Sequence, residues 1–445
     1  MKTTAGIAML TALFLGIYLP DAGHGFLRDD YGWILGSRLD SIADLPRLFR
    51  TNVGFYRPLV STSFAIDYAV WHLDPRGYAY TNLLLAAADA VLLFTLLRRL
   101  RLPVPAAVMA TATWAFNFHA MNMALLWTSG RTALWLCLFG LASAHAAFAR
   151  RHVLAGALVL AAMLCKEEAV LLPLVIVSID LIGRDGRPIG DRMRNALVMG
   201  PLVAALAVYG LLRINSGAMG PMSAPDYYQF TFNPLRVLRN TLEYLDRGAT
   251  WPFVVGLVLA WAARNAGPFD EHERRVIKFG ATWFVALYGL TVFLPVRSSL
   301  YALAPSLGSA AIVSAVASRT WRLRPERFQR LSLALVLVLV ALIPVYRSRN
   351  RGWVPASDLA AGVMRTLQSE AVGRSAGRVI IADDPAASTT MAEAFWLSMP
   401  TAVHLFLGPD WTAEIVPSPR ELPQQVTEDA LVYELRDGSI ARVVR

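Results

Sequence analysis

Charged side chains are scarce in this chain. Only 17% of its 445 residues are Asp, Glu, Lys or Arg, whereas 56% are hydrophobic, and a soluble globular protein has about 25% charged residues. Apolar runs of about 20 residues recur through the first three quarters of the sequence, and each is long enough to span about 30 Å of hydrocarbon. This composition excludes an ordinary soluble protein and predicts an integral membrane protein.

Cysteine is nearly absent too. The two cysteines, Cys137 and Cys165, both lie in apolar segments, so we expect them to pack in the core rather than to form a disulfide or hold a metal. A clean small-x-small cleavage site is also missing after the first apolar segment, where Pro20 and Asp21 interrupt the sequence. We therefore interpret this segment as an uncleaved first helix with its N-terminus inside.

The net charge of +10 does not indicate a nucleic-acid partner. Lys and Arg cluster in the short gaps between apolar runs, where the positive-inside rule places them in cytoplasmic loops. The basic residues therefore indicate topology.

Hydropathy and loop charge together predict a polytopic α-helical protein with about eleven crossings. Three charges, Lys166-Glu167-Glu168, interrupt the apolar stretch 153–182. At a helix centre each would cost about 2.5–3.5 kcal/mol, so we predict two shorter helices that meet at an external turn. The predicted crossings are the N-terminal segment, 78–97, 104–118, 132–149, the two within 153–182, 195–213, 250–263, 276–294, 300–317 and 331–346.

The chain is predicted to contain two domains. Residues 1–346 form the membrane domain, with external loops at 21–76 and 214–248, and a short amphipathic helix at 60–72 lies at the interface. Residues 347–445 form a small external α/β domain.

Four elements are predicted within that small domain. They are a helix that opens at Ser357-Asp358, a strand in GRVIIADDP, a helix in TTMAEAFWLSM, and a hairpin that turns at Asp437-Gly438.

Two adjacent acids, Asp29 and Asp30, follow the first apolar segment just past the expected bilayer edge. Adjacent carboxylates in a partly desolvated pocket raise each other's pKa, which suits a general base that works near neutral pH. The simpler interpretation is a solvated loop acid, or a cap for the helix that YGWILGS predicts. The residues alone leave both interpretations open.

Six segments, the first of which contains the acid pair, occur in this order along the chain: GFLRDDYGWI, FYRPLVSTSFAIDYAVW, GYAYTNLLL, LLWTSGR, LCKEEAVLLP and VRSSLYALAPS. In this order they resemble the integral-membrane glycosyltransferases of the GT-C superfamily, especially bacterial relatives of the polyprenyl-phosphate-mannose-dependent O-mannosyltransferases. The resemblance covers roughly residues 1–310. It implies a GT-C-like fold, a sugar on polyprenyl phosphate as the donor, and Asp29 or Asp30 as the catalytic base.

The resemblance also implies residues that hold the substrate. The first candidates for the donor phosphate are Lys166 and Arg297, and Arg297 begins a segment similar to the family's Arg-x-x-x-Tyr-x-x-Pro pattern. Each cation has a simpler alternative as an interfacial side chain that snorkels, and an ion pair is an equal alternative for Glu167. The complete set implied for substrate binding is Arg57, Tyr56, Arg131, Lys166, Glu167, Arg297 and Tyr301, and the aromatics Trp33, Tyr56, Tyr227 and Tyr228 are candidates for stacking on a sugar.

Three positions depart from the family pattern. Met123 and Ala133 stand where relatives often carry acids, and Ala86 stands where a His is common. Fewer acids weaken the case for a divalent metal, because hard cations prefer oxygen ligands. We expect no cofactor, and the sequence leaves a divalent metal open.

The predicted activity is inverting transfer of a hexose from a polyprenyl-phosphate carrier to an unknown lipid, glycan or protein acceptor. One base suffices, because a phosphate leaves as a stable anion, unlike the sugar alkoxide of glycosidases. The resemblance implies a bacterial inner membrane. The loop charges and the odd number of crossings place the active site and the C-terminal domain on its periplasmic side. The alternatives are a transporter or lipid-carrier flippase, which would show midplane polar pairs and inverted repeats, and a non-catalytic binding protein on the same scaffold.

Overall fold

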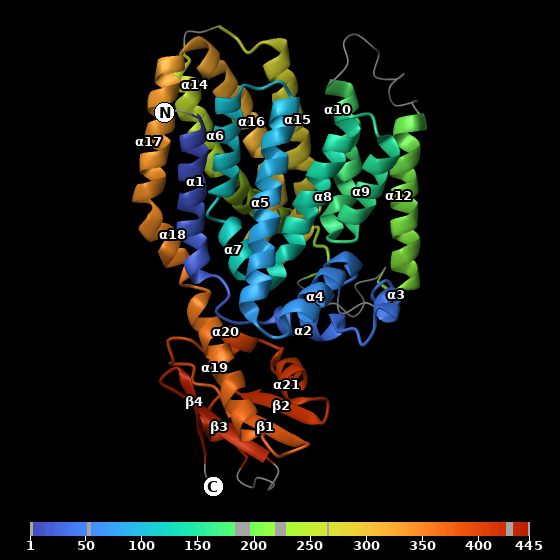
Figure 1. Cartoon of the computed structure of the whole chain (residues 1–445), viewed down its shortest axis with the longest axis vertical. Coiled ribbons are helices and arrows are strands. Elements are labelled where there is room, and N and C mark those ends of the chain that lie inside the picture. The colour runs from blue at the N-terminus through green and yellow to red at the C-terminus, as the bar shows by residue number, and fades with distance from the viewer. Residues whose placement is uncertain are drawn as a thin grey trace.

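The apolar segments of the sequence form a bundle of helices (Figure 1). The computed structural model describes residues 3–50, 55–182, 196–218, 228–264, 267–423 and 430–443. Each predicted crossing contains a helix, which confirms the predicted fold class. The bundle helices are α1 (Thr3–Tyr18), α5 (Pro75–Arg99), α6 (Val104–Ala115), α8 (Arg131–Phe148), α9 (His152–Met163), α10 (Leu172–Ile182), α12 (Ala196–Asn215), α14 (Trp251–Ala262), α15 (Glu271–Tyr288), α16 (Leu303–Leu323) and α17 (Pro325–Ala341).

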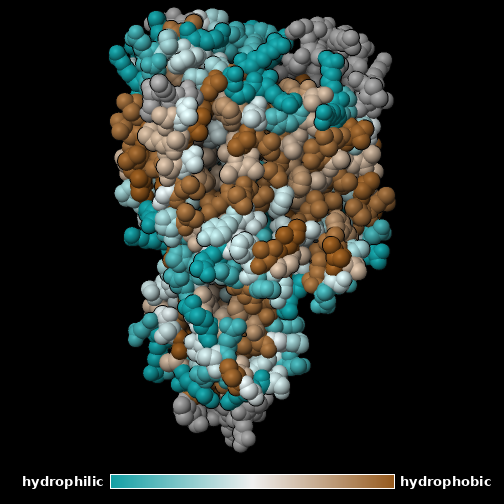
Figure 2. Space-filling view, viewed as in Figure 1, coloured by the Kyte–Doolittle hydropathy of each residue, from teal (hydrophilic) through white to brown (hydrophobic). Residues whose placement is uncertain are grey.

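Not all of these helices meet a strict criterion for crossing a membrane. By length and composition, five helical stretches of the described residues qualify, or six if the bent pair Pro325–Ala341 and Ile343–Glu370 counts as one span. Three shorter apolar helices accompany them. The count of about eleven crossings therefore stays a prediction. On the face shown in Figure 2, apolar side chains cover most of the middle of the bundle, and hydrophilic ones are frequent at its upper end and on the C-terminal part.

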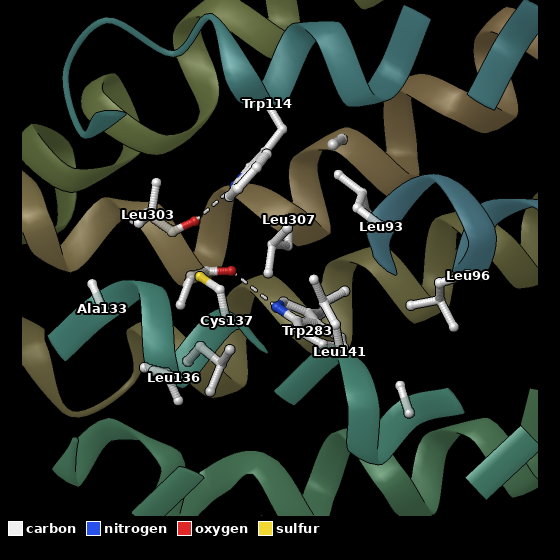
Figure 3. Packing of buried hydrophobic residues seen from close by; sticks show 14 of the residues in the cluster. Leu93, Leu96, Trp114, Ala133, Leu136, Cys137, Leu141, Trp283, Leu303 and Leu307 are labelled. Atoms are coloured by element: carbon white, nitrogen blue, oxygen red, sulfur yellow. Dashed lines mark hydrogen bonds between the residues drawn. The ribbon is translucent and has the colours of Figure 1, made fainter. Parts of the chain in front are cut away.

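Helix α16 is the most deeply buried helix of the bundle, and Figure 3 shows its packing. Two buried tryptophans bind the carbonyls of its first turn: Trp114 Nε1 donates to Leu303 O (3.3 Å), and Trp283 Nε1 donates to Ala304 O (2.9 Å). Small residues let α15 come close, because a Cβ on Gly308 would lie 2.3 Å from the carbonyl oxygen of Gly280.

Short helices lie at one end of the bundle (Figure 1): α2 (Asp29–Ser37), α3 (Leu45–Leu48) and α4 (Pro58–Trp71). Two further short helices are α7 (Met121–Leu126) and α13 (Pro234–Leu245). Helix α4 corresponds to the predicted amphipathic helix at 60–72, and it exposes Ile66, Val70 and Trp71. The C-terminal sheet lies beyond α2 at this same end, and the N-terminus lies toward the opposite end (Figure 1).

The C-terminal part combines a sheet with helices, as predicted, and the sheet has four strands among the described residues. Its strands are β1 (Gly377–Ala382), β2 (Trp411–Val416), β3 (Ala430–Arg436) and β4 (Ser439–Arg442), in the order β2-β1-β3-β4. The first three strands are parallel, and β3-β4 is the predicted hairpin. Its turn residues Asp437 and Gly438 both have positive φ (48° and 74°).

Three details of this part differ from the prediction. Helix α19 (Val354–Glu370) begins three residues before Ser357-Asp358, with Pro355 in its first turn, where proline is favoured. The Ser357 hydroxyl donates back to Val354 O and does not cap the helix. The predicted single helix is two, α20 (Met391–Phe395) and α21 (Met399–Leu407), separated at Trp396 (φ 51°). Strand β2 was not predicted.

Candidate active site

The acid pair forms the first turn of α2. Carboxylates are favoured there by the partial positive charge of a helix N-terminus. The preceding residue, Arg28, has φ 49°, which is uncommon outside glycine. Because successive helical residues point about 100° apart, the two carboxylates face different surroundings.

Asp30 is bound on both oxygens. Its Oδ2 accepts from Leu27 N (2.9 Å), and its Oδ1 accepts from Ser129 N (2.7 Å) and from the Ser129 hydroxyl. Ser129 belongs to the segment LLWTSGR, which leads directly into α8. Through its hydrogen bonds to Ser129, Asp30 therefore connects α2 to the bundle. Burial raises the pKa of Asp30 to about 7, although the hydrogen bonds from Ser129 and Leu27 oppose that rise.

Asp29 is partly exposed and has a different environment. Its carboxylate has no hydrogen bond or ion pair with any residue that the structure describes. Burial raises the pKa of Asp29, and the positive charges of Arg57 and Arg28 oppose the rise. Of the two acids, Asp29 therefore has the oxygens available to accept a proton.

Arg57 precedes α4 and is locked to the turn between α9 and α10. Its guanidinium binds Glu167 with three hydrogen bonds, Nε at 3.2 and 3.1 Å and Nη2 at 2.7 Å. It also lies 4.3 Å from the centre of the Phe55 ring, and Arg213 is 3.7 Å from the same Glu167. Burial lowers the pKa of Arg57, but the Glu167 carboxylate outweighs burial and raises it overall.

Lys166 is buried in that same turn. Its Nζ donates to Glu168 Oε1 at 2.6 Å and lies 4.3 Å from the centre of the Tyr301 ring. Burial lowers the pKa of Lys166, and Glu168 opposes the shift. Tyr301 in turn packs on Tyr244, with ring centres 6.1 Å apart. The structure thus brings the predicted residues Lys166 and Tyr301 together.

Arg297 lies further out. It is paired with Glu243 of α13, which also binds Arg239 at 3.0 Å. Its segment is tied to the inner residues through Tyr244, whose hydroxyl donates to Val296 O at 3.4 Å. Arg297 is therefore a peripheral cation whose guanidinium is already paired.

Arg131 lies behind the site. It is fully buried and bound to Asp67 (2.6 Å), Asn82 (3.1 Å), Ser63 (3.2 Å) and the carbonyl of Tyr78 (3.1 Å). With these contacts Arg131 joins α4, α5 and α8, so we assign it to the framework of the site.

Two of the predicted aromatics also belong to this framework. Tyr56 is buried and donates to Phe49 O at 3.1 Å. Trp33 stacks on Phe55 and on Phe64. Tyr228 packs edge-on against Phe55 with ring centres 5.2 Å apart, and Tyr227 lies outside the described residues.

Sequence reasoning missed several members of this network. Asp67 and Asn82 could have been found from the sequence, because a polar side chain within an apolar helix is costly to insert in a membrane and therefore often has a structural or functional role. Ser129 and Arg213 could not, since their contacts connect segments far apart in the chain. Asp89 of α5 is fully buried, and both of its carboxylate oxygens lack a hydrogen bond among the described residues.

Of the three positions that depart from the family pattern, Ala86 and Ala133 are buried. Met123 receives a hydrogen bond from the Ser298 hydroxyl on its sulfur at 3.4 Å. Among the described residues, no three His, Cys, Asp or Glu side chains are grouped so that they could hold a metal ion.

Comparisons with known proteins give two matches. The protein O-mannosyl-transferase Tmtc1 of Drosophila melanogaster is 30% identical over 220 residues, which are 45% of this chain and 25% of that protein. The chain thus matches about a quarter of that relative's length. The crystal structure of ArnT from Cupriavidus metallidurans, bound to undecaprenyl phosphate, aligns with a TM-score of 0.47 and 15% identity over 83% of this chain and 73% of that one. No family model matches. The similarity to Tmtc1 confirms the predicted resemblance to membrane O-mannosyltransferases.

Proposed function

We propose that this chain is an inverting membrane glycosyltransferase that moves a hexose from a polyprenyl-phosphate carrier to an acceptor hydroxyl at the external face of the membrane. One observation supports the proposal. The Asp29 carboxylate has no hydrogen bond with the described residues, and the positive charge of Arg57 lowers its pKa. Arg57 is itself bound by Glu167, which lies in the same turn as Lys166. In a bacterium the membrane would be the inner membrane, with residues 1–346 as the catalytic domain and 347–445 as a periplasmic domain.

Asp29 serves as the general base in this mechanism. It takes the proton of the acceptor hydroxyl while that oxygen bonds to the anomeric carbon from the face opposite the carrier. The bond between the anomeric carbon and the phosphate oxygen breaks, and its electron pair stays on the polyprenyl phosphate. No proton donor is required for this leaving group. A positioned base contributes about 10²–10⁴ in rate.

Arg57 and Lys166 provide the positive charge for the departing phosphate. Nη1 of Arg57 has no hydrogen bond with any described residue. Lys166 uses one of its three N–H donors to bind Glu168. Glu167 and Glu168 hold these cations in position before the substrate arrives. Preorganised charge of this kind stabilises a transition state strongly because it needs no reorganisation.

The test is transfer in proteoliposomes with a polyprenyl-phosphate hexose that carries a radiolabelled sugar. We expect polyprenyl phosphate and labelled acceptor to appear in equal amounts with the wild-type protein, and Lys166→Met to lower kcat by about 10²–10³-fold. Lys278→Met, which removes an exposed lysine on α15, is the matched control. Donor that crosses the bilayer intact would identify a flippase, and donor that is bound without release of polyprenyl phosphate would identify a binding protein.

A further inference from the structure

The segment that leads into Asp29 is held by the C-terminal domain. Arg28 donates twice to the last carbonyls of α20, from its backbone N to Ala394 O (3.1 Å) and from Nε to Glu393 O (3.0 Å). These carbonyls end a helix and have no partner within it. Arg28 therefore acts as their cap, and its own positive-φ backbone conformation (φ 49°, ψ −116°) is held by tertiary contacts rather than by local preference.

Helix α20 is itself anchored to the sheet. Asp383, at the end of β1, accepts from Met391 N (2.8 Å) and Ala392 N (3.2 Å) at the beginning of α20. Asp383 thus holds one end of this short helix, and Arg28 is bound at the other. Hydrogen bonds therefore connect Asp383 at the sheet to α20, and α20 to Arg28, the residue before Asp29.

Further contacts hold the segment on both sides of Arg28. Tyr31 stacks on Phe395 with ring centres 5.6 Å apart and an interplanar angle of 19°. Before Arg28, His24 pairs with Asp358 of α19 at 3.0 Å, and a Cβ on Gly25 would lie only 2.4 Å from the carbonyl oxygen of Ser357. The loop is therefore packed against α19 and α20, with no room for a side chain at position 25.

From these contacts we infer that the C-terminal domain positions the catalytic base, and that Arg28 is the positioning residue through which it does so. The inference rests on the proposed role of Asp29. The domain fixes the backbone at residue 28, and residue 29 is the first residue of α2, so a shift of α20 would move the Asp29 carboxylate relative to Arg57. A misplacement of about 1 Å can cost about 10²-fold in rate.

Arg28→Gly is the informative variant. Glycine adopts positive φ without strain and keeps the backbone donor to Ala394 O, so the fold is preserved. The variant loses the guanidinium and its bond to Glu393 O, and the backbone at residue 28 is less restricted. We expect kcat per folded molecule to fall about tenfold or more with KM within about twofold. Arg28→Lys keeps the charge and should restore part of the loss. Arg378→Ala, which removes an exposed ion pair with Glu414 in the same domain, is the matched control.

The pH profile gives a second measurement that a purely structural role would not change. Among the described residues, the charges of Arg57 and Arg28 lower the pKa of Asp29, and the Asp29 carboxylate raises the pKa of its neighbour Asp30. Because the positive charge of Arg28 lowers the pKa of Asp29, its removal should move the acidic limb of kcat/KM to higher pH, and Arg28→Lys should leave the limb in place. An unchanged kcat in Arg28→Gly, or a raised KM with unchanged kcat, would overturn the inference. Activity retained in Asp29→Asn would instead overturn the proposed function.

Discussion

Asp29 and Asp30 are neighbours in the chain but differ in what binds them. Asp30 is buried and accepts three hydrogen bonds, two of them from Ser129, whereas Asp29 accepts none from the described residues. The sequence predicted the pair as the centre of the site and left open which acid is the base. It could not decide, because the answer depends on a contact between residues 99 positions apart in the chain.

Asp30→Asn should therefore reduce stability. The asparagine oxygen can still accept from Ser129, but its amide would face the N–H of Leu27 and leave a buried donor without a partner. We expect a loss of about 1–3 kcal/mol in the free energy of unfolding, seen as a lower Tm in detergent. Asp29→Asn, whose side chain has no such partner, should stay within about 0.5 kcal/mol of wild type. Equal stability of the two variants would contradict this assignment.

The different surroundings of Asp29 and Asp30 also predict how the transfer activity depends on pH. A base works in its deprotonated form, and burial raises the pKa of Asp29 above its ordinary value. Activity should therefore fall on acidification at a higher pH than for a solvated Asp, whose pKa is about 3.9. Asp30 also titrates, at about 7, so kcat/KM should be measured from pH 4 to 9 in Asp30→Asn as well. An acidic limb that disappears in Asp30→Asn together with a fall of about 10²-fold or more in kcat/KM would identify Asp30 as the base.

At the scale of elements, the charged turn Lys166-Glu167-Glu168 was predicted well. The cost of three charges at a helix centre implied a break between two helices, and the structure has α9 and α10 separated there. The sequence allowed an ion pair for Glu167 but could not predict Arg57 as its partner, because the two residues are 110 positions apart and meet only where α4 begins beside this turn. The break between α20 and α21 at Trp396 could not be predicted either, because a tryptophan in the sequence does not indicate a positive φ.

Close packing of α15 on α16 depends on glycine. Gly308→Ala would place its Cβ 2.3 Å from Gly280 O and 2.7 Å from Phe284 N, both of them backbone atoms. We expect a loss of about 1–3 kcal/mol by overpacking, measured as a lower Tm. In Gly210→Ala on α12 the new Cβ meets nothing within 4 Å. That variant should be neutral or more stable by about 0.5–1 kcal/mol, and a similar result at both positions would argue against the close crossing.

At the scale of the whole molecule, the short helices α2, α3 and α4 lie at one end of the bundle, and the C-terminal sheet lies beyond them (Figure 1). Alternation of crossings and loop charge predicted a common external side for these segments. What the sequence could not predict is that the C-terminal domain packs directly on the acidic loop, because those contacts join residues 24–31 to residues 357–395.

The orientation can be tested by labelling, because the two native cysteines are buried. Val372→Cys, at an exposed position after α19, should react with an impermeant maleimide in intact spheroplasts. Ala149→Cys, exposed at the end of α8 toward the opposite end of the bundle, should react only after lysis. The reverse pattern would place the proposed site in the cytoplasm.

The central claim is that the Asp29 carboxylate accepts the proton of the acceptor hydroxyl. Its most direct test is the kcat of Asp29→Asn for sugar transfer from a polyprenyl-phosphate donor in proteoliposomes. The account predicts a fall of about 10²–10⁴-fold at unchanged Tm. A variant that turns over at the wild-type rate would contradict it.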